Sequence, residues 1–178
     1  MKILLVIPII FILIYCDSKD VKPHVDTSIR GGELPAQESW NSTVFFTDSG
    51  KTKAVLYTGH LQVFNMRKET LLDEGLKVEF FNANEIKTTT LTSIRGRVDE
   101  RTDDLYAIDS VVAVNDSGIV VKTDELKWRN RDKKIVSDKF VTIDSPEEHI
   151  EGYGFESDQH LRNYIIYNIT YITNAKKD

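Results

Sequence analysis

The sequence Leu76-Lys77-Val78-Glu79-Phe80 alternates apolar and charged residues from one position to the next. In an extended chain this places Leu76, Val78 and Phe80 on one face and the two charged side chains on the other. The pattern therefore predicts a β-strand that buries one face and exposes the other to water.

Other short runs of β-branched and aromatic residues extend this pattern along the chain, at residues 54–57, 61–64, 105–114, 119–121, 126–128, 135–136, 140–143 and 164–172. Turn-forming residues separate many of them, at 48–50, 82–84, 115–118, 129–132 and 144–146. This regular spacing predicts an all-β sandwich, roll or barrel. Residues 69–76 could form one helical turn. Within residues 105–114 the apolar residues change from one set of alternate positions to the other. This change predicts a bulge or a strand that is apolar on both faces.

The composition limits the class of protein. The chain has 178 residues, of which 40% are hydrophobic and 29% charged, so we expect one globular domain and not bulk disorder. The net charge of −5 argues against nucleic acid as a partner, because an acidic surface gains nothing from displacing the counterions of phosphates. The single cysteine, Cys16, excludes an internal disulfide framework and a cysteine-based zinc site.

An uninterrupted apolar run from Ile3 to Tyr15 follows Lys2. As a helix it would be about 20 Å long, shorter than the ~30 Å hydrocarbon core of a bilayer, which favours a secretory signal. The ending Leu13-Ile14-Tyr15-Cys16 resembles a bacterial lipoprotein signal with Cys16 as the acylated residue, although Tyr15 stands where a small residue is usual. The alternative is an uncleaved anchor; either reading predicts an exported chain tethered to a membrane.

Four regions follow from these patterns. We expect an anchor at residues 1–16, a flexible linker rich in proline, glycine and polar residues at 17–38, a folded β-domain at 39–173 and a polar tail at 174–178.

Several motifs, taken in order, resemble the LptC family of lipopolysaccharide-export proteins. They are Leu91-Thr92-Ser93-Ile94-Arg95-Gly96, the run from Ser110 to Gly118, Thr123-Asp124-Glu125-Leu126-Lys127-Trp128, Ile135-Val136-Ser137-Asp138, Val141-Thr142-Ile143 and Ile150-Glu151-Gly152-Tyr153-Gly154-Phe155-Glu156-Ser157-Asp158. The resemblance covers roughly residues 38–168. The chain departs from the family pattern at Asp109, where a glycine is expected.

The resemblance implies a curved antiparallel β-jelly roll with an open groove. It also implies a function without catalysis or cofactor. The protein would accept lipopolysaccharide from an inner-membrane ABC transporter, at the periplasmic face of that membrane, and pass it to a periplasmic β-jelly-roll bridge protein.

A lipid carrier needs a continuous apolar face, and a curled sheet can supply one. The candidates for the groove lining are Leu76, Val78, Phe80, Leu105, Val112, Val114, Val121, Trp128, Ile143, Ile150, Gly152, Gly154 and Phe155. The alternative is that most of these residues fill a closed core. Gly152 and Gly154 indicate either room for an acyl chain or a bulge beside a turn.

The last strand, residues 164–172, is a candidate edge strand that docks the downstream partner by β-augmentation, as the family implies. Its candidate contact residues are Tyr164, Ile166, Tyr167, Ile169 and Tyr171. The alternative is an internal strand that is paired on both sides.

Two other classes of function remain open from the residues alone. A metal site would use residues from the run Glu147, Glu148, His149, Glu151, Asp158 and His160, and a glycosidase pair would come from Asp103, Asp104, Asp109 and Glu125. We disfavour both, because the first run reads as a solvated loop and no spacing selects a pair in the second. A structural or adhesive surface lipoprotein, all-β but without a lipid groove, is the main alternative.

Overall fold

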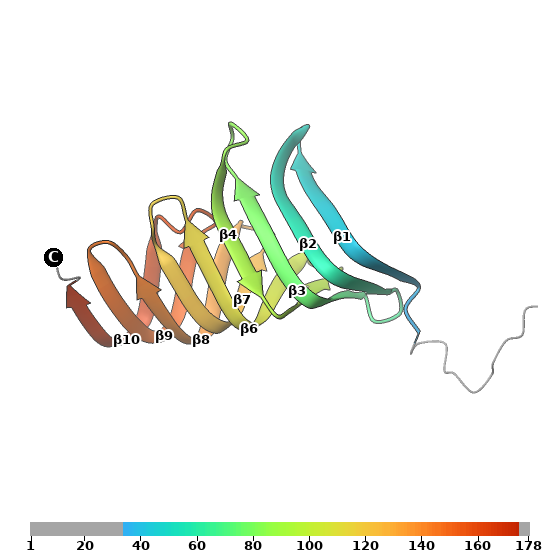
Figure 1. The fold of residues 1–178 in the computed structure, drawn as a ribbon. Coiled ribbons are helices and arrows are strands. Elements are labelled where there is room, and N and C mark those ends of the chain that lie inside the picture. The colour runs from blue at the N-terminus through green and yellow to red at the C-terminus, as the bar shows by residue number, and fades with distance from the viewer. Residues whose placement is uncertain (1–33, 175–178) are drawn as a thin grey trace, which may run out of the picture. The chain divides into compact units, whose positions relative to one another are not determined.

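Ten β-strands form the regular structure of residues 34–174, the part of the chain that the computed structural model describes (Figure 1). These residues fall within one compact unit. No helix in this part is long and apolar enough to cross a membrane. Cys16, the predicted anchor, most of the predicted linker and residues 175–178 lie outside the described residues.

The strands form one antiparallel sheet whose order largely follows the sequence, β1-β2-β3-β4-β6-β7-β8-β9-β10. The short strand β5 follows β4 after one residue and fills the space between β3 and β6. The bounds are β1 (Gln37–Asp48), β2 (Lys51–Phe64), β3 (Glu69–Phe81), β4 (Lys87–Ser93), β5 (Arg95–Asp99), β6 (Asp104–Asn115), β7 (Val120–Arg129), β8 (Lys134–Asp144), β9 (Glu148–Asp158) and β10 (Tyr164–Asn174).

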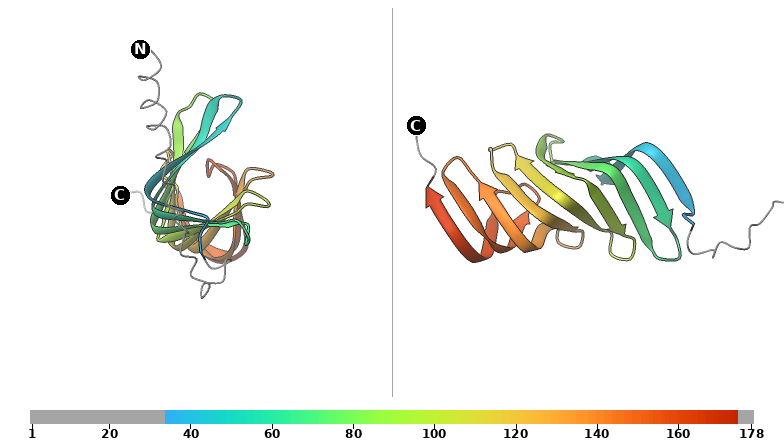
Figure 2. Two further views of the ribbon diagram at one scale, coloured as in Figure 1. Left: turned by 90° about the vertical axis from the view of Figure 1, so that its right-hand side faces the viewer. Right: turned by 60° about the horizontal axis from the view of Figure 1, so that its bottom comes forward.

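The pairing register breaks near the middle of most strands. It shifts between Thr58 and His60 on β2, and between Ile108 and Val111 on β6. Equivalent shifts follow on β7, β8 and β10, and the gap between β4 and β5 continues the same line. A bulge bends its strand, so a line of bulges bends the whole sheet. Figure 2 shows the result, a sheet that curves round an open side.

The bend divides the sheet into two parts, each with one row of directly paired residues on the concave face. The first wall carries the row Val44, Leu56, Val78, Leu91, Ala113, Val121, Ile143 and Ile150. The second wall carries the row Val63, Thr70, Val98, Leu105, Trp128, Ile135, Ser157 and Tyr164. Direct pairing puts each row on a single face of the sheet.

The curved antiparallel β-jelly roll is confirmed. The alternation at Leu76–Phe80 forms part of β3 as expected, with all three apolar side chains buried. The bulge predicted within residues 105–114 lies at Asp109 and Ser110, whose φ angles are 65° and 51°. Glycine adopts such left-handed angles without steric cost, which fits the glycine that the resemblance implies at the position of Asp109.

Several strands differ from the sequence-based expectation. Residues 69–76 form strand, because β3 pairs with both β2 and β5 and this pairing overrides the local helical composition. The separate runs predicted within β2, β7 and β8 belong to continuous strands that cross the bend. Strands β1, β4 and β5 were not predicted, and β1 begins at Gln37, inside the stretch assigned to the linker. The run from Glu147 to His160, read as a solvated loop, lies mostly in β9, because this stretch pairs with β8 on one side and β10 on the other.

Strands β1 and β10 are the two ends of the described sheet. β10 pairs with β9 alone, and β1 pairs with β2 alone. Of the two readings of residues 164–172, the structure therefore supports an edge strand. Its outer edge presents unpaired backbone groups within the part of the chain that is described.

Candidate functional site

The concave face is apolar from β1 to β9. Ala113, Val121 and Ile143 of the first-wall row are 0% exposed, as is Ile135 of the second-wall row. Buried side chains of both walls belong to one apolar cluster, and at the β9–β10 end of the sheet Phe155 and Tyr164 stack with ring centroids 6.4 Å apart. The face thus forms a closed apolar core in its middle part.

The walls separate near β1 and leave a cavity of ≈ 550 Å³. Its apolar lining includes Phe46, Phe80 and Trp128, and the rings of Phe80 and Trp128 lie 6.2 Å apart between centroids. Lys53 and Lys133 stand among the polar residues of the lining. Asp48 and Asp103 belong to the lining as well, so this is an amphipathic site with an apolar interior and charged groups of both signs beside it.

Three buried side-chain atoms of the described residues have no hydrogen-bond partner, and all belong to the concave face. They are Thr89 Oγ1, Trp128 Nε1 and Ser157 Oγ. Trp128 and Ser157 lie in the second-wall row, and Thr89 pairs with Phe80 on the first wall. Buried polar groups in native proteins are almost always bonded, to protein or to ordered water, so these three atoms are free to bond water or a bound molecule.

The convex face carries charged pairs instead. Glu79 lies 2.9 Å from Lys77 Nζ and 3.4 Å from Lys87 Nζ, and the hydrogen bond from Lys77 holds the pKa of Glu79 below its usual range. Tyr106 lies between the cations of Arg97 and Lys127. A face of this kind is suited to water and cannot shelter an acyl chain.

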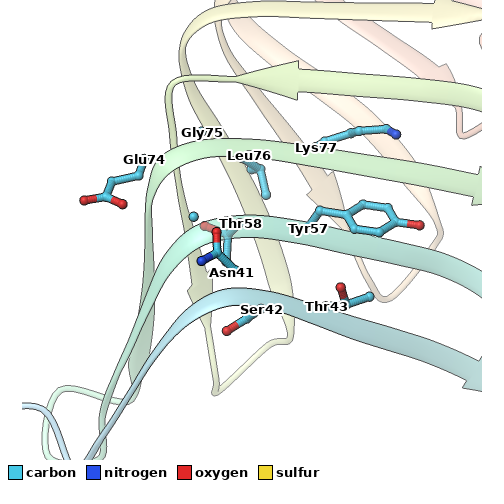
Figure 3. A pocket seen from close by; sticks show the side chains of 10 residues that line it. Asn41, Ser42, Thr43, Tyr57, Thr58, Glu74, Gly75, Leu76 and Lys77 are labelled. Atoms are coloured by element: carbon cyan, nitrogen blue, oxygen red, sulfur yellow. The ribbon is translucent and has the colours of Figure 1, made fainter.

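A further hollow of ≈ 450 Å³ crosses β1, β2 and β3 at the bend (Figure 3). Asn41, Thr58, Glu74 and Lys77 are among its lining residues, most of which carry polar side chains. It arises where Gly59 closely approaches the backbone of Glu74, and its polar lining does not continue the apolar face.

The carboxylate and histidine alternatives gain no support from the geometry. Among residues 34–174, no three His, Cys, Asp or Glu side chains gather as a metal site. His149 contacts Asp144 and Glu151, whereas His160 contacts Thr88. Of the glycosidase candidates, Asp104 pairs with Lys127, and Asp109 pairs with Arg95.

Residues 3–170 match the family of lipopolysaccharide-assembly, LptC-related proteins, and so nearly the whole chain is covered. The chain belongs to this family. No curated protein matches the sequence. LptC-related proteins are inner-membrane-anchored, periplasmic components of lipopolysaccharide transport and bridging, and not enzymes, so membership gives this chain a role in lipopolysaccharide transport.

Most of the predicted lining residues of this LptC-related chain lie on the concave face. Leu76, Val78, Phe80, Leu105, Val121, Ile143, Ile150 and Phe155 are buried there, and Trp128 is half-buried. Val112 and Val114 point the other way, because the buried residues of β6 keep one parity on both sides of the bulge, as Leu105 and Ala107 before it show. Val111 and Ala113 occupy the concave face instead.

The two predicted glycines serve strand packing. A Cβ on Gly152 would lie 2.4 Å from the carbonyl oxygen of Asn168, so this glycine permits the close approach of β10. Gly154 has a φ of +78°, faces the ring of Tyr167 and lies opposite the register shift between Ser137 and Phe140 on β8. Neither glycine lies beside a turn, and the extra residues of the neighbouring register shifts belong to β8 and β10, so both glycines lie where β9 passes through the bend.

Sequence reasoning missed concave-face residues on strands that it did not predict. They include Val44 and Phe46 on β1 and Leu91 on β4. Val44-Phe45-Phe46 has no alternation that would mark its two faces. On β10, Ile166 is buried while Tyr167, Ile169 and Tyr171 are more than half exposed, so these three remain available to a partner.

His149 supplies a pH-dependent contribution to stability. Its Nδ1 lies 2.6 Å from Asp144 and its Nε2 lies 3.2 Å from Glu151; these hydrogen bonds, Asp144 first, raise the pKa of His149 above 6.5. A pKa raised in the folded state adds stability that is complete below pH 6.5 and is lost as the pH rises through the folded-state value. We therefore expect the free energy of unfolding to fall modestly above that pH.

Urea unfolding of the wild type and of His149→Gln at a series of pH values measures this contribution. The free energy of unfolding of the His149→Gln variant is expected to lack this decline. At low pH its dependence on pH is expected to follow that of the wild type. Identical pH profiles for the two proteins would contradict the assignment to His149.

Proposed function

We propose that this protein accepts lipopolysaccharide from an inner-membrane ABC transporter and holds its acyl chains against the concave face. It then passes the lipid to a periplasmic β-jelly-roll bridge protein. The observation that carries the proposal is the unbroken row of apolar residues along the first wall, from Val44 on β1 to Ile150 on β9. The row reaches from one end of the sheet almost to the other.

The energetics favour a continuous face and not a catalytic group. Each buried CH₂ contributes about 0.8 kcal/mol. Exposing one acyl chain of a dozen carbons would therefore cost on the order of 10 kcal/mol. A row of paired apolar side chains lets a chain advance from strand to strand without meeting water.

The two edges supply the connections to partners. β10 would dock the bridge protein by strand pairing, with Tyr167, Ile169 and Tyr171 as its exposed contacts. β1, at the other edge, would face the transporter. The segment 1–16 would anchor the chain, through an acylated Cys16 or as an uncleaved segment, and residues from 17 up to β1 would form the linker.

A photoreactive benzoylphenylalanine at Phe46 tests the proposal. Phe46 lines the cavity beside β1, so irradiation of cells is expected to attach lipopolysaccharide to this position. Tyr106 is the matched control, since it is an aromatic residue on the convex face between Arg97 and Lys127. We expect a lipopolysaccharide adduct at Phe46, detected as a retarded band, and none at Tyr106.

Equal labelling at Phe46 and Tyr106, or no labelling at Phe46, would contradict the proposal. The second result would favour a structural or adhesive lipoprotein, whose concave face is only a core.

A further inference from the structure

The connection between β9 and β10 crosses the open side of the folded sheet. This segment, residues 159–163, is called the strap. It leaves the second wall after Asp158, yet its contacts are with the first wall. His160 Nδ1 lies 2.7 Å from Thr88 Oγ1, Asn115 Nδ2 donates to the carbonyl of His160 at 3.1 Å, and Arg162 Nη2 lies 3.0 Å from Asp116. The strap therefore closes the open side at this point.

Leu161 of the strap inserts between the walls. Its side chain is 0% exposed and belongs to the same apolar cluster as both rows. Its φ is 55°, an uncommon conformation for a bulky residue, and Asp158 supports it by accepting hydrogen bonds from the backbone of His160 and Arg162. Leucine thus occupies, in a strained backbone conformation, space between the walls that an acyl chain would need.

The strap also lies between two hollows. Gln159 helps to line the cavity of ≈ 550 Å³ beside β1. Asp158, Arg162 and Asn163 help to line a pocket of ≈ 740 Å³ beside β10, together with the charged residues Lys134, Glu148 and Glu156 and the apolar Ile165. The strap therefore lies beside the concave face between the β1 end and the β10 end of the sheet.

Two of the unpartnered buried atoms lie next to this crossing. Thr89 Oγ1, on a residue 1% exposed, follows Thr88, which holds His160. Ser157 Oγ, on a residue 2% exposed, precedes Asp158, where the strap begins. Their unmet hydrogen bonds are independent of the strap's own contacts and suit the ester, amide or hydroxyl groups near the head of an acyl chain.

We propose that the strap is a gate in the lipid path, which the passing lipid displaces. When it opens, His160 leaves Thr88, Leu161 leaves the space between the walls, and acyl chains take its place. The inference rests on the proposed transport function. The polar contacts that hold the strap to the first wall are two hydrogen bonds and one exposed ion pair, which are weak enough to exchange. The burial of Leu161 also holds the strap, and the acyl chains that take its place would restore that apolar contact, whereas the β-ladders of both walls stay intact.

A reversible cross-link tests the gate. Thr88→Cys with His160→Cys, joined in cells by a short bifunctional methanethiosulfonate, ties the strap to the first wall in the full chain. Benzoylphenylalanine at Phe46 reports lipid before the strap, and at Ile169 on β10 it reports lipid beyond it. Locking is expected to lower the lipopolysaccharide adduct at Ile169 by about tenfold or more, with reductant restoring it, while the adduct at Phe46 persists.

The matched control is Lys122→Cys with Thr142→Cys, a directly paired position within the first wall. Cross-linking this pair is expected to leave both adducts unchanged. Asp116→Cys with Arg162→Cys provides a second lock at an exposed site, in case the buried pair disturbs folding.

The outcomes separate the two proposals. An Ile169 adduct that persists in the locked protein would overturn the gate and leave the transport function in place. Loss of the adduct at Phe46 in every variant, unlocked ones included, would overturn the transport function itself. Loss of the Ile169 adduct in the cross-linked Lys122→Cys, Thr142→Cys control would also overturn the gate. Any cross-link in the sheet would then be enough to stop the lipid.

Discussion

Gly152→Val is expected to detach β10 from the sheet. A Cβ at this position would lie 2.4 Å from the carbonyl oxygen of Asn168, 2.8 Å from Ile166 Cγ2 and 3.0 Å from Ile169 Cα. Two of these atoms belong to the backbone, so a change of rotamer cannot relieve the clash. Within the described residues β10 has no strand neighbour other than β9, and moving it away breaks its whole ladder.

Amide hydrogen exchange measures this effect directly. We expect the amides of β10 to lose most of their protection in Gly152→Val, by about a hundredfold or more in rate, while β2 and β3 remain protected. Docking of a downstream partner on β10 is expected to be lost together with the protection of the β10 amides. Gly50→Asn is the control, because nothing lies within 4 Å of its Cβ position and asparagine tolerates its positive φ.

Unchanged protection of β10 in Gly152→Val would show that the strands can separate locally at this point. The role assigned to Gly152 would then be wrong. A similar loss in Gly50→Asn would point instead to general destabilisation.

Phe80→Ala is expected to cost about 3–5 kcal/mol of the free energy of unfolding. Phe80 is 1% exposed and is among the largest fully buried side chains, with Trp128 beside it. Truncation removes its apolar contacts and leaves a void continuous with the cavity beside β1. For a sheet that depends on one apolar face, this is a large fraction of the total stability.

Urea unfolding of Phe80→Ala and Phe45→Ala provides the comparison. Phe45 has the same side chain but is 65% exposed, so its truncation is expected to change the free energy of unfolding by less than about 0.5 kcal/mol. Equal losses for the two variants would contradict the placement of Phe80 in the core.

The strands that alternate clearly were predictable, and so was the family. Leu76 to Phe80 reveals its buried face from sequence alone, and the loss of alternation within β6 predicts the bulge at Asp109 and Ser110. The position of that bulge could not be predicted, because it depends on how β6 pairs with β7. A one-residue error in phase was enough to assign Val112 and Val114 to the wrong face.

The strap shows a second limit of sequence reasoning. Thr88 and His160 are 72 positions apart, and neither belongs to a motif that would connect them. Their meeting depends on the bend that brings the two walls face to face. The bend in turn results from bulges on several strands, which act together only in the assembled sheet.

The strand order has a consequence for the way this sheet gains and loses structure. Almost every strand pairs with its neighbours in sequence, so the chain resembles a one-dimensional array in which each unit is stabilised by the next. In such an array unfolding starts at the ends, and β1 and β10 fray before the centre does. A partner that adds a strand at either end turns the least stable unit into an interior one. Assembly with neighbours and mechanical stiffening of the chain are therefore the same event.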